Sequence, residues 1–333
     1  WYTYSMTKKY LLWAVLAALL VGGYYLLSQP VIPDTDEVIG VPTTEQPSAG
    51  SPAKPTSSVP AKDLGRLVFS ITDEAVKLDN AQSVLVNINR VEAFNAQKGW
   101  VTISSAPQTF DLVQLKKDGR FVLLGDKKVS FGDYTQIRLV IGAVVVLKDG
   151  SAHDAKILNK DLRLVTNFAV ARGATSAVTV DILGDKSLHR TSSGKYIFAA
   201  VLNLKTYERV EQVQIANKKV ELIGGTIKYN STVGVDENGD LKIGYEINSA
   251  ASLEILGDAI IVTSAGYDTN FFKFGAAESI KIATDAGHIA LALSAKSINN
   301  DENNPVWQII GMKNGKRVLV KIHGTSGKII YVQ

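Results

Sequence analysis

The stretch from Phe131 to Gly150 constrains the fold most strongly. Its sequence is FGDYTQIRLVIGAVVVLKDG, in which Ile137, Leu139 and Ile141 alternate with other residues. Alternation with a period of two is typical of a strand that is buried on one face. Gly142 interrupts the run, apolar residues then resume, and Lys-Asp-Gly closes it with a turn signal. We expect a central strand pair with partners on both sides.

The same alternation recurs on both sides of this stretch, between Leu67 and Leu204. Short apolar runs separated by turn signals roughly every 10 residues are typical of a β-sandwich. The span shows no long amphipathic helix. We therefore predict a mainly β fold in which 63–207 form an antiparallel, immunoglobulin- or transthyretin-like β-sandwich. The other strands expected there are 67–72, 84–89, 100–103, 110–113, 121–124, 162–168, 177–182 and 195–204.

Several motifs of this span occur in an order that resembles a known family. They are LVFSITDEAVKLDNAQSVLVNINRVEAF, GWVTI, TFDLVQL, FGDYTQIRLVI, VTVDI and SLHRTSSGKYIF. Over about 64–204 they resemble the exported prokaryotic family known as Domain of Unknown Function 4382. The resemblance implies an extracytoplasmic β-sandwich behind a signal peptide or lipoprotein anchor. It implies no activity and transfers no catalytic residue. The chain has no cysteine, which excludes a lipoprotein anchor, disulfides and thiol catalysis.

The N-terminal residues suggest a membrane segment. Lys8 and Lys9 precede an uncharged, mostly apolar run from Tyr10 to Leu27. At about 1.5 Å per residue, such a helix nearly crosses a hydrocarbon core of about 30 Å. We predict that 1–28 form a signal anchor with its N-terminus in the cytoplasm and the rest of the chain outside. A cleaved signal peptide is the alternative, although the run lacks a small-residue cleavage pattern.

A proline-rich segment follows. Seven of the nine prolines lie between Pro30 and Pro60, interleaved with serine, threonine, alanine and glycine. A segment with so few large apolar residues cannot bury enough surface to offset its ordering entropy. We predict a disordered linker over 29–62 that holds the folded body away from the membrane.

A further β-rich segment, or a second small β-domain, is expected over 208–275. Asn238-Gly239 between two apolar runs is a strong hairpin signal. Asp236, Asn238 and Asp240 also have the 1-3-5 spacing of a calcium loop. However, Leu241 stands where such a loop needs glycine, so the hairpin is favoured.

Residues 276–333 are expected to form a small α+β module. Ile289, Ala292, Leu293 and Lys296 fit helical spacing and predict a helix over Ala286–Lys296. Three strands are expected after it, over 306–310, 318–322 and 329–332. The motifs KIATDAGHIALAL, VWQIIG, NGKRVLVKI and TSGKIIYV resemble a PepSY domain over about 279–333. That resemblance implies regulation of a peptidase. Trp307 is expected to be buried, either under the helix or against a neighbouring surface.

The sequence identifies no catalytic, metal-binding or cofactor-binding residue, and the binding residues stay unknown. Acidic loops could bind calcium, but acidic residues at strand ends are usually turn formers. Histidines are scattered singly, and His189 is interpreted as a solvated loop residue. Trp100 and Tyr134 are interpreted as core or rim aromatics. The acidic loop residues are Asp73, Glu74, Asp79, Asp181 and Asp185, and the other histidines are His153, His288 and His323.

Three classes of function fit these observations. A formal net charge of +4 without a dense basic patch argues against nucleic acid as a partner. We favour a membrane-anchored, extracytoplasmic, non-catalytic binding or adhesion protein for a glycan, cell-envelope polymer or protein. The alternatives are a regulator of an extracytoplasmic peptidase and an enzyme with an unrecognised site.

Overall fold

The computed structural model describes residues 63–73, 78, 80–266, 269–298 and 304–333. All of them belong to one compact unit, Ser57–Gln333. The expected anchor over 1–28 and linker over 29–62 lie outside the described residues. Within the described ranges, no helix is both long and apolar enough to cross a membrane.

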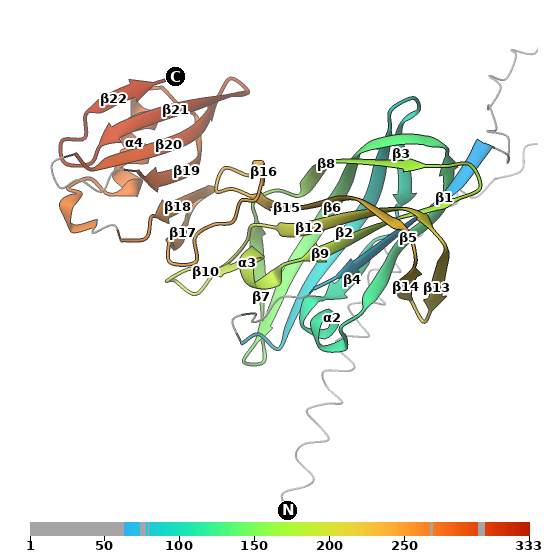
Figure 1. Cartoon of the computed structure of the whole chain (residues 1–333). Helices are drawn as coiled ribbons and strands as arrows, with labels where there is room; N and C mark the ends of the chain where they lie inside the picture. The colour runs from blue at the N-terminus through green and yellow to red at the C-terminus, as the bar shows by residue number, and fades with distance from the viewer. Residues whose placement is uncertain (1–62, 74–77, 79, 267–268, 299–303) are drawn as a thin grey trace, which may run out of the picture. The chain divides into compact units, whose positions relative to one another are not determined.

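The chain is mainly β, as expected, and its strands form three sheets (Figure 1). Two sheets pack face to face through a single apolar cluster that includes Phe69, Ile137, Phe168 and Leu204. In the first sheet the strand order is β13 (Gln212–Ala216), β14 (Lys219–Ile223), β5 (Phe121–Ser130), β1 (Leu64–Thr72), β9 (Thr175–Ile182), β12 (Val201–Val210), β15 (Thr226–Val235) and β16 (Leu241–Ile243).

The second sheet is organised around one long strand. Its order is β10 (Leu188–Arg190), β11 (Tyr196–Phe198), β7 (Ser151–Ile157), β6 (Gly132–Lys148), β2 (Ser83–Asn95) and β3 (Gly99–Ser104). Two further strands pair with this path: β4 (Gln108–Asp111) with β2, and β8 (Asp161–Val170) with β6. The expected central stretch is therefore β6, with β2 on one side and β7 and β8 on the other. The strand β7 was not expected.

Gly142 does not interrupt the central strand, contrary to the sequence expectation. A Cβ built at Gly142 would lie 2.5 Å from Oδ1 of Asn87 and 2.6 Å from Oδ1 of Asn89. The register between β2 and β6 also shifts at this level. The glycine thus leaves room for two asparagine side chains while the strand continues.

The expectation of an antiparallel sandwich is correct only in part. Most pairs of the sandwich are antiparallel, but β1–β9 and β11–β7 are parallel, as is β18–β19 in the third sheet. The pair β1–β9 arises because the chain passes through the second sheet before β9 returns beside β1. A crossover of this length permits parallel pairing, which a short hairpin does not.

The expected strand over 110–113 is also only partly correct. Phe110 belongs to β4, but Leu112 and Val113 begin a helix, α2 (Leu112–Asp118). The carboxylate of Asp111 caps this helix by accepting a hydrogen bond of 3.0 Å from the Val113 backbone. Leu112 and Leu115 are buried on one face, and Gly119 ends the helix in the left-handed conformation.

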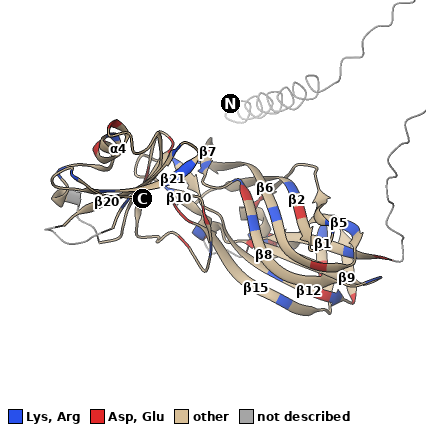
Figure 2. Ribbon diagram, turned by 90° about the horizontal axis from the view of Figure 1, so that it is seen from above, with Lys and Arg blue, Asp and Glu red and all other residues tan. Residues whose placement is uncertain are grey.

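Charged side chains form a ladder on the face of the second sheet opposite the core. Arg138 on β6 donates to Glu92 on β2 at 3.1 Å and to Asp161 on β8 at 2.5 Å. Glu92 and Arg138 are directly opposite in the strand register. Figure 2 shows basic and acidic residues interspersed along these strands. Cross-strand pairs of opposite charge stabilise strand pairing.

The third sheet contains β17 (Ser252–Leu256), β18 (Ala259–Thr263), β19 (Leu291–Ser297), β20 (Val306–Lys313), β21 (Lys316–His323) and β22 (Ile329–Val332), in that order. One helix, α4 (Ala276–Asp285), packs against it, and a 3₁₀ turn, η2 (Thr269–Phe271), precedes the helix. The three strands expected after the helix are therefore present as β20, β21 and β22. The strands of 208–275 are divided, with β13 to β16 in the first sheet and β17 and β18 in the third.

The expected helix over Ala286–Lys296 is wrong. The helix instead begins after Gly275, whose backbone N–H donates to the Glu278 carboxylate at 2.9 Å. It ends before Gly287, which has a positive φ of 70°. Most of the expected helix is the strand β19, paired with β18 and β20. Pairing on both sides overrides the helical preference of alanine and leucine.

Trp307 is buried, as expected, with 3% of its surface exposed. It lies with Ile309 and Ala283 in the cluster under α4. The opposite face of the sheet meets the turn between β15 and β16. There Lys296 pairs with Glu237 at 2.8 Å, and Arg317 pairs with Asp240.

Candidate functional site

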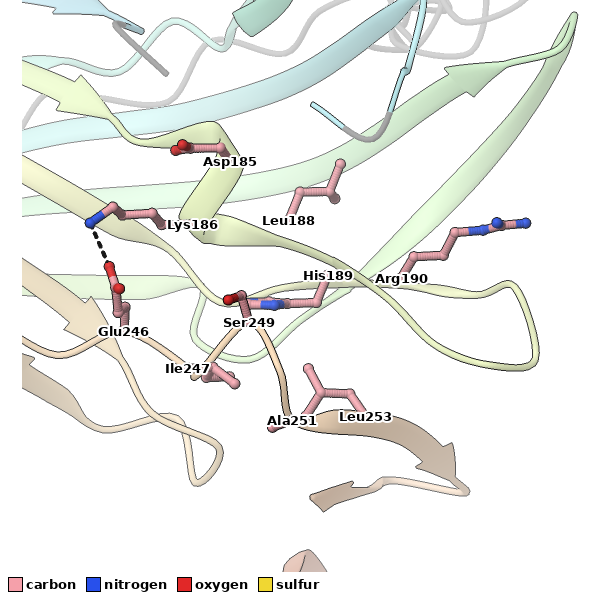
Figure 3. A pocket seen from close by; sticks show the side chains of 10 residues that line it. All are labelled: Asp185, Lys186, Leu188, His189, Arg190, Glu246, Ile247, Ser249, Ala251 and Leu253. Atoms are coloured by element: carbon pink, nitrogen blue, oxygen red, sulfur yellow. Dashed lines mark ion pairs between the residues drawn. The ribbon is translucent and has the colours of Figure 1, made fainter. Parts of the chain in front are cut away.

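A cavity of about 450 Å³ lies where the second and third sheets approach each other. We call it the His189 cavity (Figure 3). One wall comes from the short helix α3 (Gly184–Ser187) and β10, and the other from residues 246–253. Four apolar side chains contribute to the lining: Leu188, Ile247, Ala251 and Leu253.

Hydrogen bonds fix the first wall. Ser187 Oγ donates to the carbonyl of Leu183 at 2.7 Å and accepts from the Val201 backbone at 2.8 Å. The strand β10 then pairs with β11, which places His189 opposite Ile197. This wall is therefore the β10 edge of the second sheet.

The second wall is held by burial and by an ion pair. Ile247 is 5% exposed and packs with Ile197 and Leu253. The ammonium of Lys186 pairs with the carboxylate of Glu246 at 2.6 Å, as the dashed line in Figure 3 marks. The hydrogen bond with Glu246 raises the pKa of Lys186. Both residues of the pair are exposed, so its contribution to stability is small.

His189 is not the solvated loop residue expected from the sequence. It lies on β10, is half-buried and lines the cavity. Burial lowers the pKa of His189, and a hydrogen bond between the ring and the Lys186 backbone offsets part of that effect. Nε2 has no hydrogen-bond partner among the described residues. The ring is therefore neutral at pH 7.

This lowered pKa predicts a pH dependence of stability. Between the unfolded-state pKa near 6.5 and the lower folded-state pKa, the unfolded chain binds more protons. The free energy of unfolding should therefore fall as pH drops below about 6.5. Denaturant unfolding at several pH values would measure it. In His189→Gln, which does not titrate there, this part of the loss should disappear. An equal loss in both proteins would contradict the prediction.

Two charged residues of the lining have no ion pair within the described ranges. Arg190 and Asp185 are both exposed at the cavity. With Ser249 and the Lys186–Glu246 pair, they give the cavity a mainly polar open surface, since Leu188, Ile247 and Leu253 are buried. Such a lining is suited to hold and orient a polar ligand.

The acidic residues considered as calcium ligands are placed differently. Asp73 and Asp181 are buried, Asp185 lines the His189 cavity, and Glu74 and Asp79 lie outside the described residues. In the part of the chain that the structure describes, no group of three or more such side chains is placed to hold a metal ion.

The expected hairpin at Asp236–Asp240 is confirmed, because β15 and β16 pair across it. Asp236 Oδ1 accepts from the backbone of Asn238 and Asp240, at 2.9 Å each. Its other oxygen pairs with Lys242 at 2.5 Å. Asn238 also accepts a hydrogen bond from Ser294. The oxygens with calcium-loop spacing thus bind the chain itself.

A smaller polar cavity of about 250 Å³ adjoins the His189 cavity and shares Ile247 and Ala251 with it. In it Glu237 accepts from Tyr245 at 2.5 Å and from Lys296 at 2.8 Å. Burial alone would raise the pKa of Glu237, but these hydrogen bonds lower it below its usual value. Burial and the Glu237 carboxylate raise the pKa of Tyr245. Glu237 is therefore held in place by two hydrogen bonds from residues that line the same cavity.

Tyr134, Trp100, His153 and His323 have structural partners. Tyr134 is fully buried and donates to the Ser130 carbonyl at 2.8 Å. Trp100 is 37% exposed and packs edge-on against Phe94. His153 packs against Tyr196, and His323 Nδ1 accepts from two backbone N–H groups. Tyr134 is therefore a core aromatic and Trp100 a rim aromatic.

Comparison with known proteins concerns the sandwich. No curated protein and no solved structure matches the chain. The family model described as "Domain of unknown function (DUF4382)" matches residues 64–200, which run from β1 to the start of β12. The matched range starts at residue 64, where the resemblance in sequence motifs also starts. It ends at residue 200, four residues before the end of that resemblance. Residues 64–200 of this chain therefore belong to the family of domains of unknown function DUF4382.

Proposed function

We propose that this chain is a non-catalytic binding protein that holds a saccharide segment of a cell-envelope polymer in the His189 cavity. The observation that carries the proposal is the lining of that cavity. Arg190 offers a guanidinium group and Asp185 a carboxylate, and neither forms an ion pair with another residue in the described part of the chain. Leu188 and Leu253 are buried, at 9% and 4% exposure, so the open lining is mainly polar. The hydroxyl groups of a sugar are hydrogen-bond donors and acceptors, which such a lining complements.

The arrangement favours binding over reaction. Lys186 and Glu246 neutralise each other as an ion pair, so neither is poised to transfer a proton. Nε2 of His189 has no hydrogen-bond partner among the described residues, so those residues offer it no nucleophile to activate. Its ring bonds to the backbone of Lys186. These features support a recognition site.

The proposal includes the location and the finer fold. We propose that 1–28 anchor the chain in a membrane, that 29–62 act as a spacer, and that the sandwich lies outside the cytoplasm. The supporting features are Lys8 and Lys9 before an apolar run and the proline-rich segment after it. An immunoglobulin- or transthyretin-like arrangement is likewise proposed for the sandwich.

Regulation of a peptidase remains a prediction from the PepSY resemblance of 279–333. An exposed apolar edge at Trp307 would have favoured that role. Trp307 is instead buried under α4, where it packs against Phe272. The burial of Trp307 therefore removes one argument for the regulatory role.

Binding of defined oligosaccharides by the full chain tests the proposal. Cellotetraose, chitotetraose and tetragalacturonate would be titrated calorimetrically. We expect at least one of them to bind, and Arg190→Gln to weaken that binding by about tenfold, as expected for a lost hydrogen bond to a charged group.

Lys128→Gln is the matched control, because Lys128 is an exposed lysine on β5 that does not line the cavity. It removes the same charge and should leave the affinity unchanged. Absence of binding to all three oligosaccharides would overturn the proposal. Equal affinity of wild type and Arg190→Gln would do the same.

A further inference from the structure

A further cavity lies beneath the β13–β14 hairpin. Figure 1 shows this hairpin at the end of the first sheet away from β16. The strand β14 pairs with β5 only at Lys219↔Val122 and Val220↔Phe121. Beyond these pairs, the hairpin packs against the outer face of the sheet. Val220 and Leu222 contact a cluster there that includes Val68, Ala177 and Val210. We call the space enclosed in this way the hairpin cavity.

The hairpin cavity has a volume of about 390 Å³ and mainly apolar walls. Phe121 and Tyr207 contribute aromatic rings, and Val220 and Leu222 contribute aliphatic surface. Phe121, Tyr207 and Leu222 are only half-buried, so they retain apolar surface that a ligand can cover. Cavities of this size and character are typical of sites for small organic molecules.

The charges around the hairpin cavity favour an anion. Arg120 and Lys219 line it together with a single carboxylate, Glu221. Arg120 pairs with Asp118 through one guanidinium nitrogen, while its Nε has no hydrogen-bond partner among the described residues. Lys219 forms no ion pair with any other residue that the structure describes. Asp118 and Glu221 balance these two cations in formal charge, but the unpaired ammonium of Lys219 and the remaining guanidinium nitrogens of Arg120 still offer charged donors to a negatively charged head group.

We propose that the hairpin cavity binds a small organic anion with an apolar body, such as a medium-chain fatty acid. The apolar body would lie against Phe121, Tyr207 and Leu222, and the carboxylate would face Arg120 and Lys219. This site is separate from the His189 cavity, and it does not depend on the function proposed above.

Binding of anilinonaphthalenesulfonate to the full chain tests the proposal, because this probe is an apolar anion whose fluorescence rises in apolar sites. Dodecanoate should displace it. Dodecyltrimethylammonium, which has the same chain length and the opposite charge, should not. The double variant Arg120→Gln/Lys219→Gln should weaken probe binding by about tenfold through loss of the charged contacts.

Two variants control the result. Lys128→Gln removes a positive charge elsewhere on the same sheet and should bind the probe like the wild type. Arg190→Gln should also bind normally, and a loss there would assign the probe to the His189 cavity and overturn the proposal. Equal displacement by the cationic detergent would overturn it, as would unchanged binding in a double variant that unfolds at the wild-type temperature.

Discussion

Trp307→Ala should lower the free energy of unfolding of the third sheet by about 3–5 kcal/mol. The indole is 3% exposed and lies in a cluster with Ala283, Ile309 and Val320. Its ring centroid is 5.0 Å from that of Phe272. Truncation removes the apolar contacts and leaves a cavity between helix and sheet that neighbouring side chains cannot fill. Hydrogen exchange of β20 and β21 amides would measure the loss locally.

Trp307→Phe separates packing from hydrogen bonding. Nε1 of Trp307 donates to the Phe274 carbonyl at 2.9 Å, which fixes the segment before α4. Phenylalanine retains most of the apolar contact but cannot make this bond, so we expect a loss of about 1 kcal/mol from the hydrogen bond.

Ile330→Ala is the matched control for the alanine variant. Ile330 lies on β22 of the same sheet and is 45% exposed, so its truncation creates no closed cavity. Its effect should be clearly smaller than that of Trp307→Ala. If the two variants destabilise β20 and β21 equally, the assignment of Trp307 to the core of this sheet is wrong.

Most strands could be predicted from the sequence, because one face of each is buried and the chain records this as alternation. β6 shows why even a strong signal has limits. Gly142 resembles a break, but the strand continues through it, and the space beside the glycine is occupied by the side chains of Asn87 and Asn89 on the neighbouring strand. The parallel pair β1–β9 depends on the path of the chain between the strands, which local patterns do not encode.

The misplaced helix has a different cause. Ala292, Leu293 and Lys296 fit helical spacing, but residues 291–297 also alternate, and short apolar runs satisfy both periods. The cap that begins the actual helix was available in the sequence. Glu278 stands three residues after Gly275, as in a capping box. The pairing of residues 291–297 with β18 on one side and β20 on the other could not be predicted from the local sequence.

The candidate site could be predicted only in fragments. His189 and Asp185 were named as single residues, whereas Glu246 and Ile247 were not named as site residues. The two walls are separated by more than fifty residues in the chain, and their approach depends on Ile197 packing against Ile247. His189 lies in a polar, loop-like stretch of sequence, so the neighbouring residues give no pattern that predicts its burial.

Gly234→Ala should destabilise the sandwich and disturb the second wall of the His189 cavity together. Gly234 lies on β15, where a Cβ would stand 1.9 Å from the carbonyl oxygen of Tyr245. That atom is backbone, so it cannot move away without displacing the chain that carries Glu246 and Ile247. We expect a loss of about 1–3 kcal/mol or more in the free energy of unfolding, as for other overpacked sites. Denaturant unfolding measures this loss.

Gly142→Ala is the matched control for this prediction. It places the same methyl group in a strand of the same sandwich, but the atoms it meets are the ends of the Asn87 and Asn89 side chains. These can rotate away, and the alanine also reduces the freedom of the unfolded chain, so its net effect should stay within about 1 kcal/mol.

In Gly234→Ala, moreover, the shift of Tyr245 should weaken the adjacent pair of Lys186 with Glu246 and change the amide resonance of Glu246. If Gly234→Ala is as stable as Gly142→Ala and that resonance does not move, the Tyr245 carbonyl does not pack on Gly234 in solution.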